Sequence, residues 1–515
     1  MKSRTYYSII NTFASLGGYA LNLILSFICR IFFVRLLNSE YLGINGLFTN
    51  ILSMLSLAEL GIGTAMIYAL YKPVAEDDKD KIASYMHLYG IAYKTIGIVI
   101  AVMGLCMIPF LKVLINNPPH IQENITLLYL LFLFSTVSSY FFSYRSSILF
   151  AYQENYIVLS ISYIFVVIQN IVQIISLVIF KNYIIYLILQ VLFTFASNGV
   201  VSYIAKRKYP FITNKNVPKL SKDEMWSLAK NVKALTVTKI SGIIVNNTDN
   251  IVITYFKGLI TTGIISNYTL LVNALSSLVN QIFSGLTGSV GNLNALETDD
   301  RKYIVFKSLN LINFWVYGLV SVFIIVVSND VIKLFFGESY ITGIEIPIIL
   351  ALNFYMNGMQ CVVGIYKSTM GLFKYGQYIL LITAFLNLIG DFILGKAYGV
   401  FGIFLATAIS RLLTNTFYEP YIIFNHGFNK KFSEYVKRYL IYFILIIIST
   451  CFCFIVTYSM NFNVLINIIL KCIVCLIIPN FIFYISFHKS EEFSYFINIL
   501  KRIIRKIYEK IGKEI

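Results

Sequence analysis

Long apolar runs separated by short polar connections extend along most of the chain. A helix needs about 20 apolar residues to cross the hydrocarbon core of a bilayer. The runs are continuous and lack the ten-residue alternation of outer-membrane barrel strands, so they predict helices. We expect about fourteen membrane-spanning helices, covering residues 8–34, 42–70, 84–110, 125–150, 156–180, 183–205, 234–256, 259–290, 308–328, 344–370, 377–395, 398–424, 439–459 and 463–487.

Lysine and arginine are distributed unevenly between the two sides of these helices. With a cytoplasmic N-terminus, the cytoplasmic segments hold 28 of the 41 basic residues and the outer ends and loops hold 6. Cytoplasmic loops of membrane proteins carry such an excess. The net charge of +17 is then explained by the anionic inner leaflet, without nucleic acid. We expect a multi-pass protein of the bacterial cytoplasmic membrane with both termini in the cytoplasm, and the first apolar run is too long for a cleaved signal.

Three pairs of similar segments recur at nearly one spacing. The stretch "YRSSILFAYQENYIVL" at 144–159 matches "YKSTMGLFKYGQYILL" at 366–381, "AEDDKDK" at 75–81 matches "ALETDDRK" at 295–302, and "YLGI" at 41–44 matches "TTGI" at 261–264. A common offset of about 220 residues indicates an internal repeat. Each half holds six predicted helices, an even number, so the halves share one orientation.

The predicted fold is therefore an all-α polytopic membrane protein with two six-helix bundles, related by a parallel internal repeat, plus two C-terminal helices. The expected segments are a first bundle at 1–210, a basic cytoplasmic linker at 211–233, a second bundle at 234–425, two added helices at 438–487 and a basic amphipathic cytoplasmic tail at 488–515. Two like-oriented bundles predict a central cleft that opens to each side in turn.

Charged side chains inside the predicted helices are the candidate functional residues, because a charge at the bilayer centre is costly and usually faces a cavity or a partner. Arg145 and Lys367 occupy equivalent places near the cytoplasmic ends of their helices, where they either line the cleft mouth or anchor the helices by snorkelling. The candidate cleft cations are Arg30, Lys94, Arg145, Lys239, Lys367 and Arg411.

Two acidic residues, Glu59 and Asp249, are candidates for ion coupling or gating. Asp249 lies in the polar run "VNNTDNIVI", beside the position that the repeat places opposite Arg30, so the two could form a gate. The seven cysteines lie in apolar segments and the four histidines form no cluster. The pair Cys472 and Cys475 resembles a redox or metal motif, but small apolar helix residues explain it better. We expect no metal site and no cofactor.

The segment "RIFFVRLLNSEYLGINGLFTNILSMLSLAELGIGTAMIYAL" at 30–70 resembles the first hairpin of bacterial polysaccharide transporters. These are the O-antigen, capsule and exopolysaccharide flippases of the multidrug/oligosaccharidyl-lipid/polysaccharide exporter superfamily. The predicted layout of two six-helix bundles with two added helices agrees with this resemblance. The resemblance implies a flippase that moves an undecaprenyl-pyrophosphate-linked oligosaccharide from the inner to the outer leaflet. It also implies coupling to H⁺ or Na⁺, and partners such as a polymerase and other glycan-assembly proteins.

Three other functions compete with this one. A lipid II flippase of peptidoglycan synthesis shares the pyrophosphate chemistry and stays open. A cation-coupled multidrug antiporter shares the fold, but its cationic cargo favours an acidic cleft, whereas basic residues outnumber acidic ones among the candidates here. A membrane glycosyltransferase or polymerase would carry catalytic side chains in a large outer loop, and the longest one expected here is short and holds no His or Cys. We therefore expect a protein that is not an enzyme.

Overall fold

The fold was analysed in a computed structural model of the full chain. It describes the backbone of residues 4–59, 62–115, 121–152, 154–214, 217–218, 220–284, 286–372, 375–376, 378–458, 460, 462–498 and 501. For some helical residues, mainly within 4–16 and 227–246, only the backbone is described. Every regular element among these residues is a helix.

The chain forms two compact units, Met1–Ser266 and Asn267–Ile515. The helices of the first are α1 (Arg4–Leu36), α2 (Ser39–Leu55), η1 (Ser56–Glu59), α3 (Ile62–Ala75), α4 (Lys79–Leu114), α5 (Ile125–Ser143), α6 (Ser146–Ala151), α7 (Asn155–Phe180), α8 (Tyr183–Lys208), η2 (Pro210–Thr213) and the start of α9 (Lys222–Ser284). The second contains the end of α9, then α10 (Thr287–Leu296), α11 (Asp299–Phe336), η3 (Glu338–Tyr340), α12 (Glu345–Thr369), α13 (Ile379–Leu413), α14 (Asn415–Ile423), η5 (Phe424–Phe428), α15 (Ser433–Thr457) and α16 (Val464–Phe487).

Ten helices of the described residues are long and apolar enough to cross a membrane. Two of them, within α9 and α13, each contain a glycine with non-helical backbone angles, Gly258 and Gly399. Both glycines have positive φ, which favours glycine over residues with a Cβ. Across Gly399 the side chain of Asn387 reaches Thr407, so α13 is a hairpin of two helices. These glycines lie where the hydropathy pattern predicts one span to end and the next to begin.

Two predicted spans are interrupted. The span expected at 42–70 is divided into α2, η1 and α3, and the span expected at 125–150 is divided into α5 and α6. At the second break the hydroxyls of Ser146 and Ser147 donate to the carbonyls of Ser143 and Tyr144. Serine side chains that bond to nearby backbone carbonyls commonly bend a helix. A hydropathy average over a long window does not detect the hydrogen bonds of single serine side chains. The hydropathy pattern therefore did not predict the breaks.

Two glycines bring α2 and α9 into close contact in the N-terminal unit. A Cβ on Gly43 would lie 2.1 Å from the carbonyl oxygen of Leu259, and a Cβ on Gly263 would lie 2.2 Å from that of Ser39. Small residues that permit close backbone approach are typical of helix pairs in membranes. The contact places the part of α9 from Gly258 to Ser266 beside α2.

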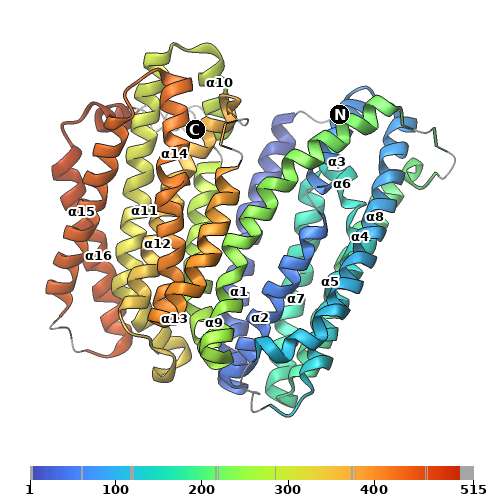
Figure 1. The fold of residues 1–515 in the computed structure, drawn as a ribbon, viewed down its shortest axis with the longest axis horizontal. Coiled ribbons are helices and arrows are strands. Elements are labelled where there is room, and N and C mark those ends of the chain that lie inside the picture. Colours follow the sequence, from blue (N-terminus) through green and yellow to red (C-terminus); the bar gives the residue numbers. More distant parts are fainter. Residues whose placement is uncertain are drawn as a thin grey trace, which may run out of the picture. The chain divides into compact units, whose positions relative to one another are not determined.

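Helix α11 forms the centre of the C-terminal unit, where it contacts α12, α15 and α16 (Figure 1). Its core contacts are aromatic, and the rings of Phe314 and Tyr442 stack at 4.1 Å between centroids. Stacked aromatic rings contribute favourable interaction beyond the area they bury.

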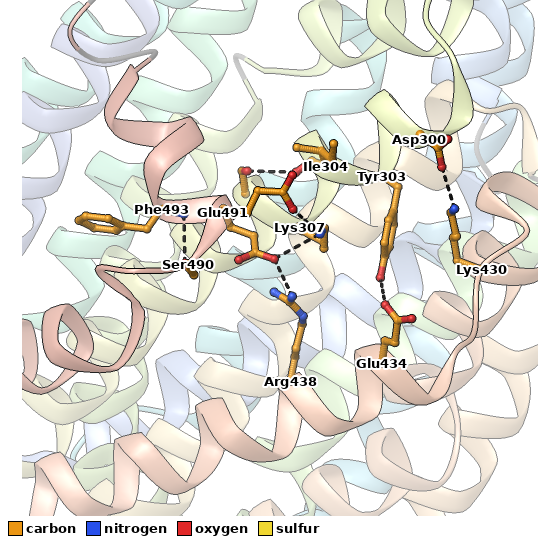
Figure 2. A network of polar contacts seen from close by, with 12 residues as sticks. Asp300, Tyr303, Ile304, Lys307, Lys430, Glu434, Arg438, Ser490, Glu491 and Phe493 are labelled. Carbon is orange, nitrogen blue, oxygen red and sulfur yellow. Dashed lines mark hydrogen bonds and ion pairs between the residues drawn. The ribbon is translucent and has the colours of Figure 1, made fainter.

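Figure 2 shows a polar network that joins α11, α15 and a helical segment at 491–498. The carboxylate of Glu492, which is only 4% exposed, pairs with Arg438 at 2.5 Å and with Lys307 at 3.4 Å. The ring of Phe493 stacks on Trp315 at 5.8 Å. Burial alone would raise the pKa of the Glu492 carboxyl, but its backbone N–H, Arg438 and Lys307 outweigh burial and lower that pKa. Residues 502–515 of the expected tail lie outside the described residues.

We predict that Glu492→Gln lowers the free energy of unfolding by about 2 kcal/mol at pH 7, because it removes the buried negative charge that pairs with Arg438 and Lys307. The folded pKa is below the unfolded one, so the stabilisation is present above the unfolded pKa and is lost as the pH falls through the folded pKa. Thermal unfolding in detergent, followed by tryptophan fluorescence, should therefore separate wild type from variant at pH 7 and converge below about pH 4.

The matched control is Glu491→Gln, the same substitution one residue earlier. Glu491 pairs with Lys307 at 3.2 Å, but its side chain is 64% exposed. Exposed ion pairs contribute at most about 1 kcal/mol. Equal effects of the two substitutions would show that burial of Glu492 does not determine the strength of the network.

Candidate functional site

Arg145 lies at the junction of α5 and α6, where the bend turns its side chain toward α8. Its Nη1 donates to Ser202 Oγ on α8 at 2.8 Å, and its guanidinium lies 5.2 Å from the ring centroid of Tyr144. Both partners are neutral, and no carboxylate of the described residues forms an ion pair with this side chain. The Arg145 side chain is half-buried. Neither contact brings a negative charge to the guanidinium.

Lys367, which the predicted repeat aligns with Arg145, has a different partner. It lies near the end of α12, and its Nζ contacts Glu419 Oε1 on α14 at 3.0 Å. Both side chains are largely buried, with 15% and 13% exposed. In both units, then, the cation connects the fourth predicted span of a half to the sixth. The charge of Lys367 is compensated, whereas the contacts of Arg145 leave its charge in place.

The remaining candidate cations are distributed over several helices. Arg30 on α1 is half-buried and its guanidinium donates to the hydroxyl of Ser266 on α9. Lys94 lies on α4 with its side chain exposed, and Arg411 is half-buried in the last turn of α13. Lys239 lies within α9, but its side chain is outside the described residues. Arg30 and Arg145 belong to the N-terminal unit and Arg411 and Lys367 to the C-terminal unit.

Glu59 ends the η1 turn and faces two tyrosines of α4. Tyr93 donates its hydroxyl to Glu59 Oε1 at 2.7 Å, and the rings of Tyr89 and Tyr93 pack edge to face at 4.5 Å. Gly63 makes room for this group, because a Cβ there would lie 2.6 Å from the Tyr93 hydroxyl and 2.7 Å from Glu59 Oε1. The predicted intramembrane carboxylate is thus held against the phenol groups of one helix face.

The other acidic candidate, Asp249, is half-buried on α9. Asp391 is a further acidic residue within a predicted span, and its surroundings are also polar. Asp391 is fully buried in α13 and accepts a hydrogen bond from Asn387 at 3.1 Å, while Asn387 also donates to Thr407 at 3.0 Å. A fully buried carboxylate is stable only if it is protonated or lies near a compensating charge.

Two further pairs join α16 to its neighbours. Lys471 contacts Asp330 of α11 at 2.5 Å, and both side chains are 19% exposed. Cys475 interacts with Cys453 of α15 through a side-chain hydrogen bond. No group of three or more His, Cys, Asp or Glu side chains suited to a metal occurs within the described parts of the chain.

The sequence located the charges but not their partners. Ser202, Glu419, Asp330 and Ser266 were not predicted, because each lies far along the chain from the cation that it contacts. The sequence does contain a local signal for the site of Glu59. Tyr89 and Tyr93 are four residues apart, so they share one face of a helix and mark a polar patch within an apolar segment.

Comparison with known proteins identifies the family. Residues 8–286 match the family described as "Polysaccharide biosynthesis protein". The chain belongs to this family. The long apolar helices of the described residues make this chain a multi-pass membrane protein.

Solved structures show that this family member has the fold of the multidrug/oligosaccharidyl-lipid/polysaccharide exporter superfamily. The lipid II flippase MurJ, in an inward closed conformation, is 17% identical, with a TM-score of 0.62 over 93% of this chain and 100% of that one. An inward-facing multidrug resistance transporter of the MATE family is 14% identical, with a TM-score of 0.51 over 77% of this chain and 91% of that one.

A third similar structure is a superfamily transporter from Pyrococcus furiosus, described as having a binding pocket of reverse polarity that suggests a different function. It is 12% identical, with a TM-score of 0.52 over 79% of this chain and 92% of that one. No curated protein matches the sequence significantly. At these identities the structural likeness establishes the fold, and the cargo has to be inferred from the residues themselves.

Proposed function

We propose that the protein is a flippase of the bacterial cytoplasmic membrane that moves an undecaprenyl-pyrophosphate-linked oligosaccharide from the inner to the outer leaflet. The cargo would be a repeat unit of O-antigen, capsule or exopolysaccharide. Family membership supports a role in polysaccharide export, and the fold supports alternating access between two halves. Both termini would lie in the cytoplasm, as the distribution of basic residues predicts.

The contacts of Arg145 carry the proposal. A guanidinium held in a membrane protein by a hydroxyl and an aromatic ring, Ser202 and Tyr144, retains the charge that an anion needs. Arginine binds phosphate oxygens with two parallel N–H groups. Lys367 differs from Arg145, because its ammonium group already forms an ion pair with Glu419. We infer that Arg145 meets the pyrophosphate and that Lys367 mainly stabilises the C-terminal unit.

The other predicted cations fit the same cargo. Arg30, Lys94, Lys239 and Arg411 are proposed as further contacts of the pyrophosphate or the sugars along the path. The lipid tail would remain in the bilayer, and a polymerase and other glycan-assembly proteins would act on the product at the outer face.

A lipid II flippase is the second candidate function. The similarity of fold to MurJ over 93% of this chain favours it, and lipid II carries the same pyrophosphate. A multidrug antiporter is disfavoured, because its cationic cargo would be repelled by the charge that Arg145 retains.

We propose that Glu59 carries the coupling ion, H⁺ or Na⁺. Glu59 lies in a predicted span and accepts a hydrogen bond from the hydroxyl of Tyr93. Acidic side chains within membrane segments commonly carry protons or ions in transporters. Asp249 and Asp391 offer further carboxylates for the same role in α9 and α13.

We predict that Arg145→Gln lowers glycan export about tenfold or more, because charge-assisted hydrogen bonds contribute about 1.5–3 kcal/mol. The measurement is surface glycan in a strain that lacks its own copy of the gene, with membrane protein levels checked. Arg145→Lys should retain part of the export, and Lys367→Gln should reduce protein stability more than export per molecule. Full export by Arg145→Gln at normal protein levels would show that Arg145 does not bind the cargo and only anchors its helix.

For ion coupling, we predict that Glu59→Gln abolishes the response of flipping to an imposed pH or Na⁺ gradient. Glutamine still accepts the Tyr93 hydrogen bond but cannot titrate. Flipping is measured in proteoliposomes with and without the gradient. The matched control is Glu123→Gln, whose carboxylate also accepts a tyrosine hydroxyl, that of Tyr41. A gradient that still accelerates the Glu59→Gln variant rules out Glu59 as the ion carrier.

A further inference from the structure

A cavity of about 270 Å³ opens within the N-terminal unit, between α2 with η1, α5 and α8. Its wall combines Leu, Val and Phe side chains with six polar ones. The polar lining residues are Thr49, Ser53, Ser56, Ser135, Thr136 and Gln190. Three different helices contribute to this polar lining, so no single helix face accounts for it.

Packing alone does not explain this set of hydroxyls. Small polar residues in membrane helices usually allow neighbouring helices to approach and close the space between them. Here the three helices stay apart and leave a cavity, although protein interiors are normally packed with few voids larger than a water molecule. A mostly apolar wall with a few convergent polar groups is typical of sites that bind small ligands.

The lining specifies the chemistry of that ligand. None of the lining side chains is ionisable, so the cavity favours neither a phosphate nor a metal ion. The hydroxyls of Ser56 and Thr136 already donate to Leu52 O at 2.9 Å and Phe132 O at 3.1 Å, which leaves their oxygens as acceptors. The Gln190 amide can both donate and accept. A neutral ligand with several hydroxyl groups and apolar C–H faces, which is a sugar, matches these groups.

The cavity also adjoins the proposed coupling carboxylate. Ser56 lines the cavity and begins the four-residue η1 turn, and Glu59 ends that turn. A ligand that presses on Ser56 therefore acts on the same short segment that positions Glu59 against Tyr93. This location fits a cargo site better than an isolated void.

We propose that this cavity is a sugar subsite that accepts one neutral sugar residue of the glycan head group, with Gln190 as its main hydrogen-bonding side chain. The proposal rests on the flippase function proposed above and assigns the recognition of sugar to a place separate from the cations that would bind the pyrophosphate. Recognition of the two parts of the cargo can then be measured separately.

The test compares two probes on the full-length protein in nanodiscs. One is the lipid-linked oligosaccharide extracted from the cells that naturally make the protein, and the other is undecaprenyl pyrophosphate without sugar. We expect Gln190→Leu to weaken binding of the first probe about threefold to tenfold, the range for lost neutral hydrogen bonds, and to leave binding of the second within about twofold.

The matched control is Gln169→Leu, the same substitution on α7 at a half-buried position outside the cavity, and it should change neither affinity. Thr49→Val removes a lining hydroxyl at nearly constant shape and serves if Gln190→Leu does not fold. If both probes bind the wild type equally, or both lining variants bind the glycan normally, the sugar subsite is wrong while the flippase function stands. If the wild type binds neither probe, the flippase function fails and the subsite fails with it.

Discussion

A charged side chain within a membrane-spanning helix must be compensated, and the way in which each one is compensated organises this protein. Lys367 with Glu419 and Lys471 with Asp330 are ion pairs that join α12 to α14 and α16 to α11. Arg145 is held instead by a hydroxyl and a ring. The first kind of contact neutralises a charge and stabilises helix packing, and the second positions a charge and preserves it.

The same distinction connects the fold to the proposed cargo. An undecaprenyl-pyrophosphate-linked glycan has an anionic part and a neutral, hydroxyl-rich part. In the N-terminal unit a preserved guanidinium would suit the first part and an uncharged cavity lined by Gln190 and hydroxyls the second. Glu59 ends the short turn that begins at Ser56, a residue that lines the cavity. Binding of cargo and binding of an ion could thus act on one short segment.

Much of the helical architecture could be predicted from the sequence, because apolar length is a local property. The turns at Gly258 and Gly399 lie where hydropathy separates two spans. The breaks near Glu59 and Arg145 could not be predicted, because they involve single serine hydroxyls that bond to nearby backbone carbonyls. The charged residues were recognisable as candidates, but their partners depend on tertiary packing. Glu419 and Ser202 carry no signal in the sequence that assigns them to Lys367 and Arg145.

Reconstitution of the purified protein tests the central claim most directly. Proteoliposomes would receive either undecaprenyl-pyrophosphate-linked oligosaccharide or a cationic dye such as ethidium, and transfer across the bilayer would be measured for each. A preserved positive charge in the transport path predicts that the lipid-linked oligosaccharide crosses and that the dye does not. Transfer of the dye without the lipid-linked oligosaccharide would contradict the account.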